Sequence, residues 1–123
     1  MLLTRHISEI SSTLLKYEEI IKSFKFKEAR LIGITMSYIK MEICFKDLST
    51  LRVTELKKNG ILENYSYYWL DKDNKILIGW DNAEHHKNID TYPHHRHLGS
   101  KENVLPSTQQ SLDDVLHYIS RIM

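Results

Sequence analysis

The sequence contains a single cysteine, Cys44, among 123 residues. One thiol cannot form an internal disulfide, which excludes the disulfide-stabilised class of secreted domains and fits a reducing cytoplasm. The sequence also lacks a glycine-rich phosphate loop, paired cysteines at zinc-binding spacing and a serine nucleophile elbow. We therefore do not expect nucleotide-dependent chemistry, and we expect Cys44 to be a small buried apolar residue.

Long apolar runs and an excess of one charge are absent as well. No apolar run approaches the roughly 20 residues that cross a bilayer, and no basic segment followed by an apolar one opens the chain. Seventeen basic residues against sixteen acidic ones leave a formal net charge of +1, so no global field attracts nucleic acid or anionic lipid. We expect a cytoplasmic protein without a membrane partner, in which any contact with nucleic acid depends on a local patch.

The apolar residues that are present predict two helices at the ends of the chain. With 41% hydrophobic and 27% charged residues, residues 1–123 fit one packed domain. A second, shorter helix begins at Ser111, with Asp113 and Asp114 in its first turn. The first helix has an amphipathic stripe at alternating steps of three and four: Ile7, Ile10, Leu14, Tyr17, Ile21 and Phe24. This stripe could pair two subunits into a homodimer, but we prefer the interpretation that it covers a sheet.

Between the helices the apolar period changes to two, which indicates strands. The alternating residues are Ile32, Ile34 and Met36; Ile39, Met41, Ile43 and Phe45; Leu51 and Val53; Tyr65, Tyr67 and Trp69; and Ile76, Ile78 and Trp80. We expect a bulge or turn near Ser37 and turns at Asn59–Gly60 and at 71–75. This order predicts an α+β fold, with an antiparallel sheet of about four or five strands flanked by the N-terminal and the C-terminal helix.

The stretch from Asn82 to Thr108 follows neither period and contains both prolines. A loop of this length in a compact domain is usually functional or disordered. Five of the seven histidines lie in it: His85, His86, His94, His95 and His97. This long histidine-rich loop, with Asp81 directly before it, is the candidate functional site.

One interpretation of the loop is a metal site. Imidazole nitrogen and carboxylate oxygen suit zinc, manganese, iron or nickel. On an extended segment, His95 and His97 share one face while His94 and Arg96 point the other way. The predicted ligands of a divalent transition metal are therefore Asp81, His95 and His97.

A second interpretation, which we prefer at this stage, is acid–base catalysis of RNA cleavage without a cofactor. An imidazole pKa near about 6.5 lets one histidine accept the proton of the ribose 2′-hydroxyl while another protonates the leaving oxygen. Arg96, between His95 and His97, would hold the phosphate. The catalytic candidates are Asp81, His85, His86, His94, His95, Arg96 and His97. Binding contacts are expected from Asn82, Trp80 and Tyr92, with Lys87 and Lys101 nearby.

A third interpretation makes the histidines structural groups that hold the loop to the sheet or form a partner interface. Outside the loop, His6 and His117 are expected to be surface or packing residues on the helices. Glu42 and Glu55 could be catalytic carboxylates or solvated strand positions. The residues Lys25, Lys27, Arg30, Lys57 and Lys58 could form a basic patch or an ordinary charged surface.

The string IGWDNAEHHKNIDTYPHHRHLG, residues 78–99, contains Asp-Asn-Ala followed by His-His, then Pro-His-His, a basic residue and His. In this pattern the chain resembles the TumE family of toxins from prokaryotic toxin–antitoxin modules. The segments 65–69 and 104–107 extend the likeness. The residues that match the motif are Asp81, Asn82, His85, His86, Pro93, His94, His95 and His97, with Arg96 at the basic position.

The resemblance implies a small cytoplasmic toxin that a cognate antitoxin, expected to carry a DNA-binding region, holds inactive. Two positions depart from the family pattern: Gly79, where many relatives have arginine, and Glu84, where they have proline. If that arginine binds phosphate in relatives, this chain must use Arg96 or another group. Residue chemistry and resemblance together predict a toxin whose histidine loop cleaves RNA. A metal-dependent hydrolase and a non-enzymatic interaction protein remain as alternatives.

Overall fold

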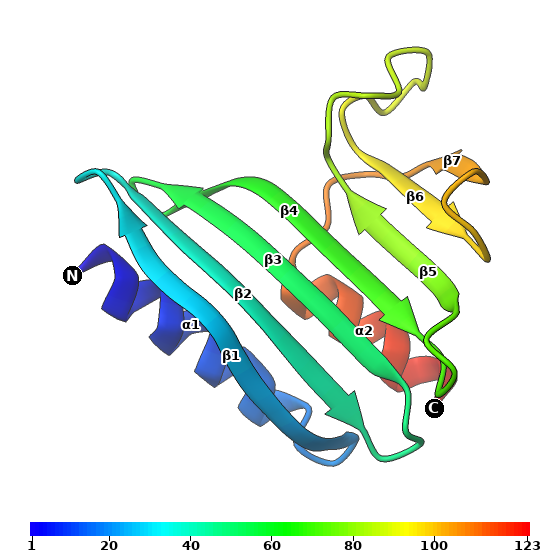
Figure 1. Cartoon of the computed structure of the whole chain (residues 1–123), viewed down its shortest axis with the longest axis horizontal. Coiled ribbons are helices and arrows are strands. Elements are labelled where there is room, and N and C mark those ends of the chain that lie inside the picture. Colours follow the sequence, from blue (N-terminus) through cyan, green and yellow to red (C-terminus); the bar gives the residue numbers. More distant parts are fainter.

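A computed structural model describes residues 1–123 as two helices and one antiparallel sheet. The elements are α1 (Leu2–Lys16), β1 (Ile21–Ile32), β2 (Met36–Phe45), β3 (Thr50–Lys58), β4 (Ile61–Leu70), β5 (Ile76–Asp81), β6 (His95–Leu98), β7 (Val104–Pro106) and α2 (Leu112–Ile122). Each strand pairs with its neighbour in sequence, so the strands lie in the order β1 to β7 (Figure 1). The predicted α+β class and terminal helices are confirmed, but the sheet has seven strands rather than four or five.

Two of the additional strands lie in the stretch predicted to be a loop. β6 pairs with β5 and with β7, so the prediction of one irregular segment from Asn82 to Thr108 was wrong. The sequence of β6 is His-Arg-His-Leu, and its two buried positions are the histidines. Because imidazoles stand where a strand normally has apolar side chains, the segment shows no apolar period.

The remaining difference arises at the end of the first helix. α1 ends at Lys16, so the predicted helical stripe is too long, and Ile21 and Phe24 belong to β1. Phe24 fits both periods, since it also alternates with Phe26 along a strand. β1 is an edge of the sheet, and its many lysines are typical of edges that avoid pairing with another chain.

Two hairpin turns show how local sequence sets the strand ends. The turn expected near Ser37 lies slightly earlier, at 33–35, where Gly33 has a φ of 63°. Asn59 and Gly60 have φ values of 51° and 81°, the conformation of a two-residue hairpin of type I′. The predicted turn at Asn59–Gly60 is therefore confirmed.

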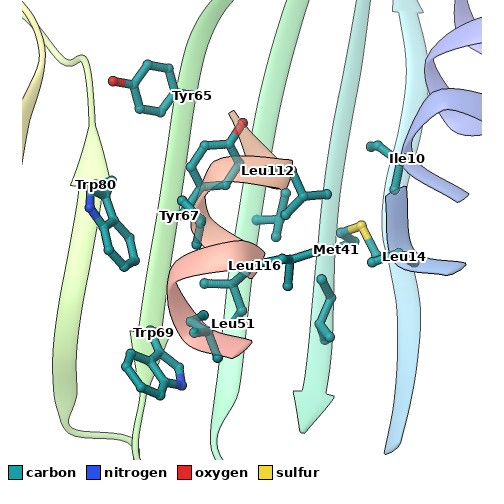
Figure 2. Close-up of a cluster of buried hydrophobic side chains, with 14 of the residues drawn as sticks. Ile10, Leu14, Met41, Leu51, Tyr65, Tyr67, Trp69, Trp80, Leu112 and Leu116 are labelled. Carbon is teal, nitrogen blue, oxygen red and sulfur yellow. The ribbon is translucent and has the colours of Figure 1, made fainter. Parts of the chain in front are cut away.

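Both helices pack on the same face of the sheet and bury one continuous core (Figures 1 and 2). Ile10 and Leu14 of α1 belong to this core, so the stripe of α1 covers the sheet, and a homodimer stays a prediction. The sheet contributes its alternate, helix-facing side chains: Ile39, Met41, Ile43, Phe45, Leu51, Val53, Tyr65, Tyr67, Trp69, Ile78 and Trp80. The opposite face, here called the open face, carries no helix. Cys44 points to that side and is only partly buried.

α2 begins where the sequence predicts. The Ser111 hydroxyl accepts a hydrogen bond from the Asp114 N–H (3.1 Å), and the Asp114 carboxylate accepts one from the Ser111 N–H (2.9 Å). This reciprocal capping box satisfies two amide groups that the helix cannot pair by itself.

A buried polar cluster lies beneath α1. His6 contacts the Glu55 carboxylate through Nε2 (2.8 Å) and the Ser37 hydroxyl through Nδ1 (2.8 Å), and the Tyr67 hydroxyl donates to Glu55 (2.6 Å). His6 is 1% exposed and Glu55 is 4% exposed. Glu55 is therefore a buried structural carboxylate rather than a solvated strand position. The cluster holds α1 to the sheet.

Replacing His6 with alanine should lower the free energy of unfolding by about 3 to 5 kcal/mol, because it leaves the Glu55 carboxylate buried without its partner. Urea denaturation measures this change. The control is Ser8→Ala on the exposed side of α1, which should change stability by less than about 0.5 kcal/mol. If His6→Ala lowers the free energy of unfolding no more than Ser8→Ala does, the contact of His6 with Glu55 does not hold α1 to the sheet.

Gly79 of β5 lies opposite Tyr68 of β4. A Cβ atom at Gly79 would overlap the ring carbons Cδ1 and Cε1 of Tyr68. The Tyr68 ring thus occupies, on the open face, the space that a longer side chain at position 79 would need. This packing accounts for glycine at position 79.

The substitution Gly79→Ala should destabilise the protein by about 1 to 3 kcal/mol, because the added methyl group displaces the Tyr68 ring. The same change in a Tyr68→Ala background should be neutral or slightly stabilising, since alanine is preferred to glycine within a strand. Chemical denaturation of the wild type, Gly79→Ala, Tyr68→Ala and the double variant measures the coupling free energy between positions 68 and 79. Equal costs in both backgrounds would show that Tyr68 is not the obstacle.

Candidate functional site

The pairing of β5 with β6 brings the carboxylate and two histidines together. In this register Asp81 lies opposite His95, and Gly79 lies opposite His97. Directly opposed residues of an antiparallel pair point to the same face of the sheet. Asp81, His95 and His97 therefore lie side by side on the open face, while Trp80 and Arg96, which are also opposed, point to the helices.

Asp81 is held by four contacts and is 7% exposed. Its Oδ1 atom lies 2.7 Å from His95 Nε2 and accepts a hydrogen bond from the Ala83 N–H (3.0 Å). Its Oδ2 atom lies 3.2 Å from His97 Nε2 and accepts a hydrogen bond from the Tyr68 hydroxyl (2.8 Å). The carboxylate is thus fixed between two imidazoles.

The far side of each imidazole faces a backbone carbonyl. His95 Nδ1 lies 3.0 Å from the Pro93 oxygen, and His97 Nδ1 lies 2.8 Å from the Lys101 oxygen. Because a carbonyl oxygen only accepts, each Nδ1 must carry the hydrogen and donate it. Histidines that bind metals are commonly oriented in this way, with one N–H donated to a carbonyl and the other nitrogen turned to the ion.

A third imidazole completes the group. The His86 ring centroid lies 4.8 Å from that of His95 and 5.9 Å from that of His97, and the His95 and His97 centroids are 4.9 Å apart. Each of the three histidines offers a nitrogen within 4.8 Å of the others. We call His86, His95, His97 and Asp81 the histidine cluster.

The charges of the histidine cluster favour a bound cation. Because both Nδ1 atoms carry a hydrogen, the Nε2 atoms of neutral His95 and His97 direct lone pairs toward the Asp81 carboxylate. A divalent ion between these groups would be bound by two imidazole nitrogens and a carboxylate oxygen. Ligand atoms bound at about 2.1 Å to one ion lie about 3.0 to 3.4 Å apart, close to the Nε2–oxygen distances of 2.7 and 3.2 Å at Asp81. The predicted ligands Asp81, His95 and His97 therefore lie together, and the structure adds His86.

Tyr68 supports the histidine cluster and was missed in the sequence. Its ring stacks on His97 at a centroid distance of 5.7 Å, and the Lys101 ammonium lies 5.8 Å from the ring centroid. Burial and the neighbouring Asp81 carboxylate raise the pKa of Tyr68 well above its ordinary value, so its hydroxyl remains a donor. The signal for Tyr68 was its position between Tyr67 and Trp69, which places it on the opposite face of β4.

His94 lies apart from the cluster and contacts β4. Its Nδ1 atom lies 2.9 Å from the Tyr65 hydroxyl, and the two rings stack at 5.8 Å. The Tyr65 oxygen accepts a hydrogen bond from the Gln110 N–H (3.3 Å), so its own hydrogen is free to go to His94. Burial, and then the nearby His95, lower the pKa of His94. A neutral His94 thus holds the loop to the sheet.

The predicted binding residues are not gathered around the cluster. Asn82 accepts a hydrogen bond from the Tyr65 N–H and donates one to the Glu63 carbonyl, both at 2.9 Å, so its side chain extends the pairing of β4 and β5. Trp80 is buried on the helix side, with its ring 5.5 Å from that of Tyr118. Arg96 is on that side too, and its Nε atom is buried without a hydrogen-bond partner.

His85 and Tyr92 are exposed on the loop between β5 and β6. Partial desolvation and the neighbouring Glu84 carboxylate raise the pKa of Tyr92. Glu84 thus lies close to Tyr92. Of the ten predicted site residues, the structure brings only Asp81, His86, His95 and His97 into one group.

Comparison with known proteins gives one match. No solved structure and no curated protein matches the chain, and no helix of the structure is long and apolar enough to span a membrane. The profile described as Toxin TumE matches residues 11–123. This range contains every residue of the histidine cluster and leaves out the first part of α1, including His6. The chain therefore belongs to the TumE family, the toxins of toxin–antitoxin modules whose partner is an antitoxin.

Proposed function

We propose that this toxin cleaves RNA in the cytoplasm with the help of a divalent transition metal held by the histidine cluster. The observation that carries the proposal is the orientation of His95 and His97. Both donate Nδ1–H to a carbonyl oxygen and turn Nε2 to the same carboxylate. His86 adds a third nitrogen on the loop side.

The geometry favours a metal over the acid–base mechanism that we preferred from the sequence. A general acid or base needs a nitrogen within hydrogen-bond reach of the substrate. Both nitrogens of His95 and of His97 already have partners within the protein. The two side chains are also buried, with 2% and 5% exposure. They are better suited to hold an ion than to exchange protons with RNA.

The chain's own residues then have separate roles. Asp81 and the three histidines hold the ion, and Tyr68 fixes Asp81 by its hydrogen bond (2.8 Å). The exposed ammonium of Lys101 lies above the Tyr68 ring on the open face, where it can contact a phosphate group. Lys101 would take the place we had given to Arg96, which points away. When bound, the ion supplies a Lewis acid that stabilises negative charge on a phosphoryl oxygen.

Protein purified without nickel resin should contain about one equivalent of a divalent transition metal, measured by elemental analysis. His97→Ala removes a ligand, and Asp81→Asn removes the negative charge between the two imidazoles. Each should weaken metal binding by at least about 10- to 100-fold, since even partners of ligands have effects of this size. His117→Ala on the exposed side of α2 is the matched control. Equal metal content in all four proteins, or none after loading with zinc, manganese, iron or nickel, would refute the metal site.

The second prediction concerns the reaction. Purified toxin should cleave a mixed pool of labelled RNAs. A chelator or His95→Ala should reduce the cleavage rate by about 100-fold or more, because the Lewis acid lowers the activation barrier by several kcal/mol. Adding back the metal should restore the wild type but not the variant. Ribonuclease activity would be refuted if the toxin stops growth when it is expressed in cells but cleaves no RNA as a purified, folded and metal-loaded protein.

A second candidate is acid–base cleavage without a metal. The contact of 2.7 Å between Asp81 and His95 favours it, because a carboxylate can orient a catalytic imidazole. The same experiment separates the two mechanisms. Cleavage that survives the chelator but not His95→Ala would support acid–base catalysis. If the histidine variants remain toxic, the cluster is structural.

A further inference from the structure

We infer that the open face of the sheet is a binding track for single-stranded RNA that leads to the histidine cluster. The inference rests on the proposed function, because it names the form of RNA that reaches that site. Figure 1 looks onto this face, with both helices behind the sheet. Neither helix covers it, and the strands β1 to β5 expose their second set of alternate side chains there.

A groove of about 580 Å³ runs along the open face to the cluster. At one end it is lined by Arg30 of β1 and Tyr38 of β2, and at the other by Tyr68, Asp81 and Lys101. Asp81 belongs to both the groove and the histidine cluster. A chain bound along the groove would therefore place a phosphodiester next to the carboxylate and to Lys101.

The groove presents two tyrosine rings. Tyr38 and Tyr68 are the partly exposed aromatic residues among its lining, whereas Tyr67, Trp69 and Trp80 are turned to the helices and buried in the core. Unpaired bases stack on aromatic rings with little regard to sequence. A base can stack on either ring when the cation over it, Arg30 at Tyr38 or Lys101 at Tyr68, turns to a phosphate, so this groove fits single-stranded nucleic acid.

Basic side chains accompany the rings. Lys40 and Arg52 are exposed on the same face as Tyr38 and Tyr68, and Arg30 lies over the Tyr38 ring, 5.2 Å from its centroid. The carboxylates of this face have partners: Glu42 pairs with Lys27, and Glu28 pairs with Arg30. Although the net charge of the whole chain is only +1, Arg30, Lys40 and Arg52 thus form a local basic patch. Such a patch attracts phosphate groups even though the protein as a whole is nearly neutral.

The rings distinguish single-stranded from double-stranded RNA. In a duplex the bases are stacked on one another and cannot lie on a tyrosine. The position of the groove favours RNA over a protein partner, because it ends at Asp81 of the histidine cluster, where the proposed cleavage needs a phosphodiester. The groove is therefore better suited to an unpaired, anionic strand than to the antitoxin.

Binding should be measured in a chain that does not cleave. In the His97→Ala background with a chelator, fluorescence anisotropy of a labelled mixed-sequence single-stranded RNA reports affinity, and the same sequence as a duplex is the competitor. Tyr38→Ala should weaken binding by roughly 5- to 100-fold through lost stacking. Lys40→Gln and Arg52→Gln should each weaken it and lower the salt dependence by about one counterion. Arg5→Gln and Arg121→Gln, exposed on the helices, should change neither quantity.

The outcomes separate this inference from the proposed function. If the toxin cleaves no RNA but binds it with an affinity that the three substitutions weaken, the track is supported and the ribonuclease proposal is refuted. Unchanged affinity in Tyr38→Ala, Lys40→Gln and Arg52→Gln, or a preference for the duplex, would overturn the track. If these three variants keep RNA affinity but no longer copurify with the antitoxin, the open face is the antitoxin surface instead. Circular dichroism of each variant confirms that it is folded. The same substitutions are also measured in the otherwise wild-type chain with a chelator, as a second non-cleaving background.

Discussion

Backbone hydrogen bonds between β5 and β6 bring Asp81 beside His95 and Gly79 beside His97. The histidine cluster depends on this register. A shift of one residue would turn both histidines to the helix side and put Arg96 in their place. The carbonyls of Pro93 and Lys101, one on each side of β6, then fix the two rings through their Nδ1 atoms. Imidazole orientation in this protein is thus a property of the backbone, set before any ion or substrate binds.

The two faces of the sheet divide the chemistry. The face toward the helices is mostly apolar, and the buried contact of His6 with Glu55 on that face joins α1 to the strands beneath it. The open face carries charged and aromatic groups that contact solvent. Tyr68 connects this surface to the cluster, because its hydroxyl holds Asp81 while its ring lies over Gly79. Position 79 is therefore part of the site although it has no side chain.

Features that depend on neighbours in sequence could be predicted, and features that depend on distant residues could not. The cap at Ser111 and the turn at Asn59–Gly60 involve residues at most three apart, and both are present. β6 was missed because its buried positions are histidines, which read as polar. The contact of His6 with Glu55 spans 49 residues, and that of Tyr68 with Asp81 spans 13 across a hairpin. The motif located the cluster, but only the strand register showed which of its histidines meet.

The strand order has a consequence for synthesis. Because every strand pairs with the one before it, the sheet can extend from β1 onward as the chain leaves the ribosome, N-terminal elements first. The partners of Asp81 belong to β6 and to the loop before it, and α2, which closes the core, comes last. A nascent chain therefore acquires the open face well before it acquires the histidine cluster. If the histidine cluster is the toxic site, as proposed above, the chain becomes toxic only after nearly all of it has been synthesised.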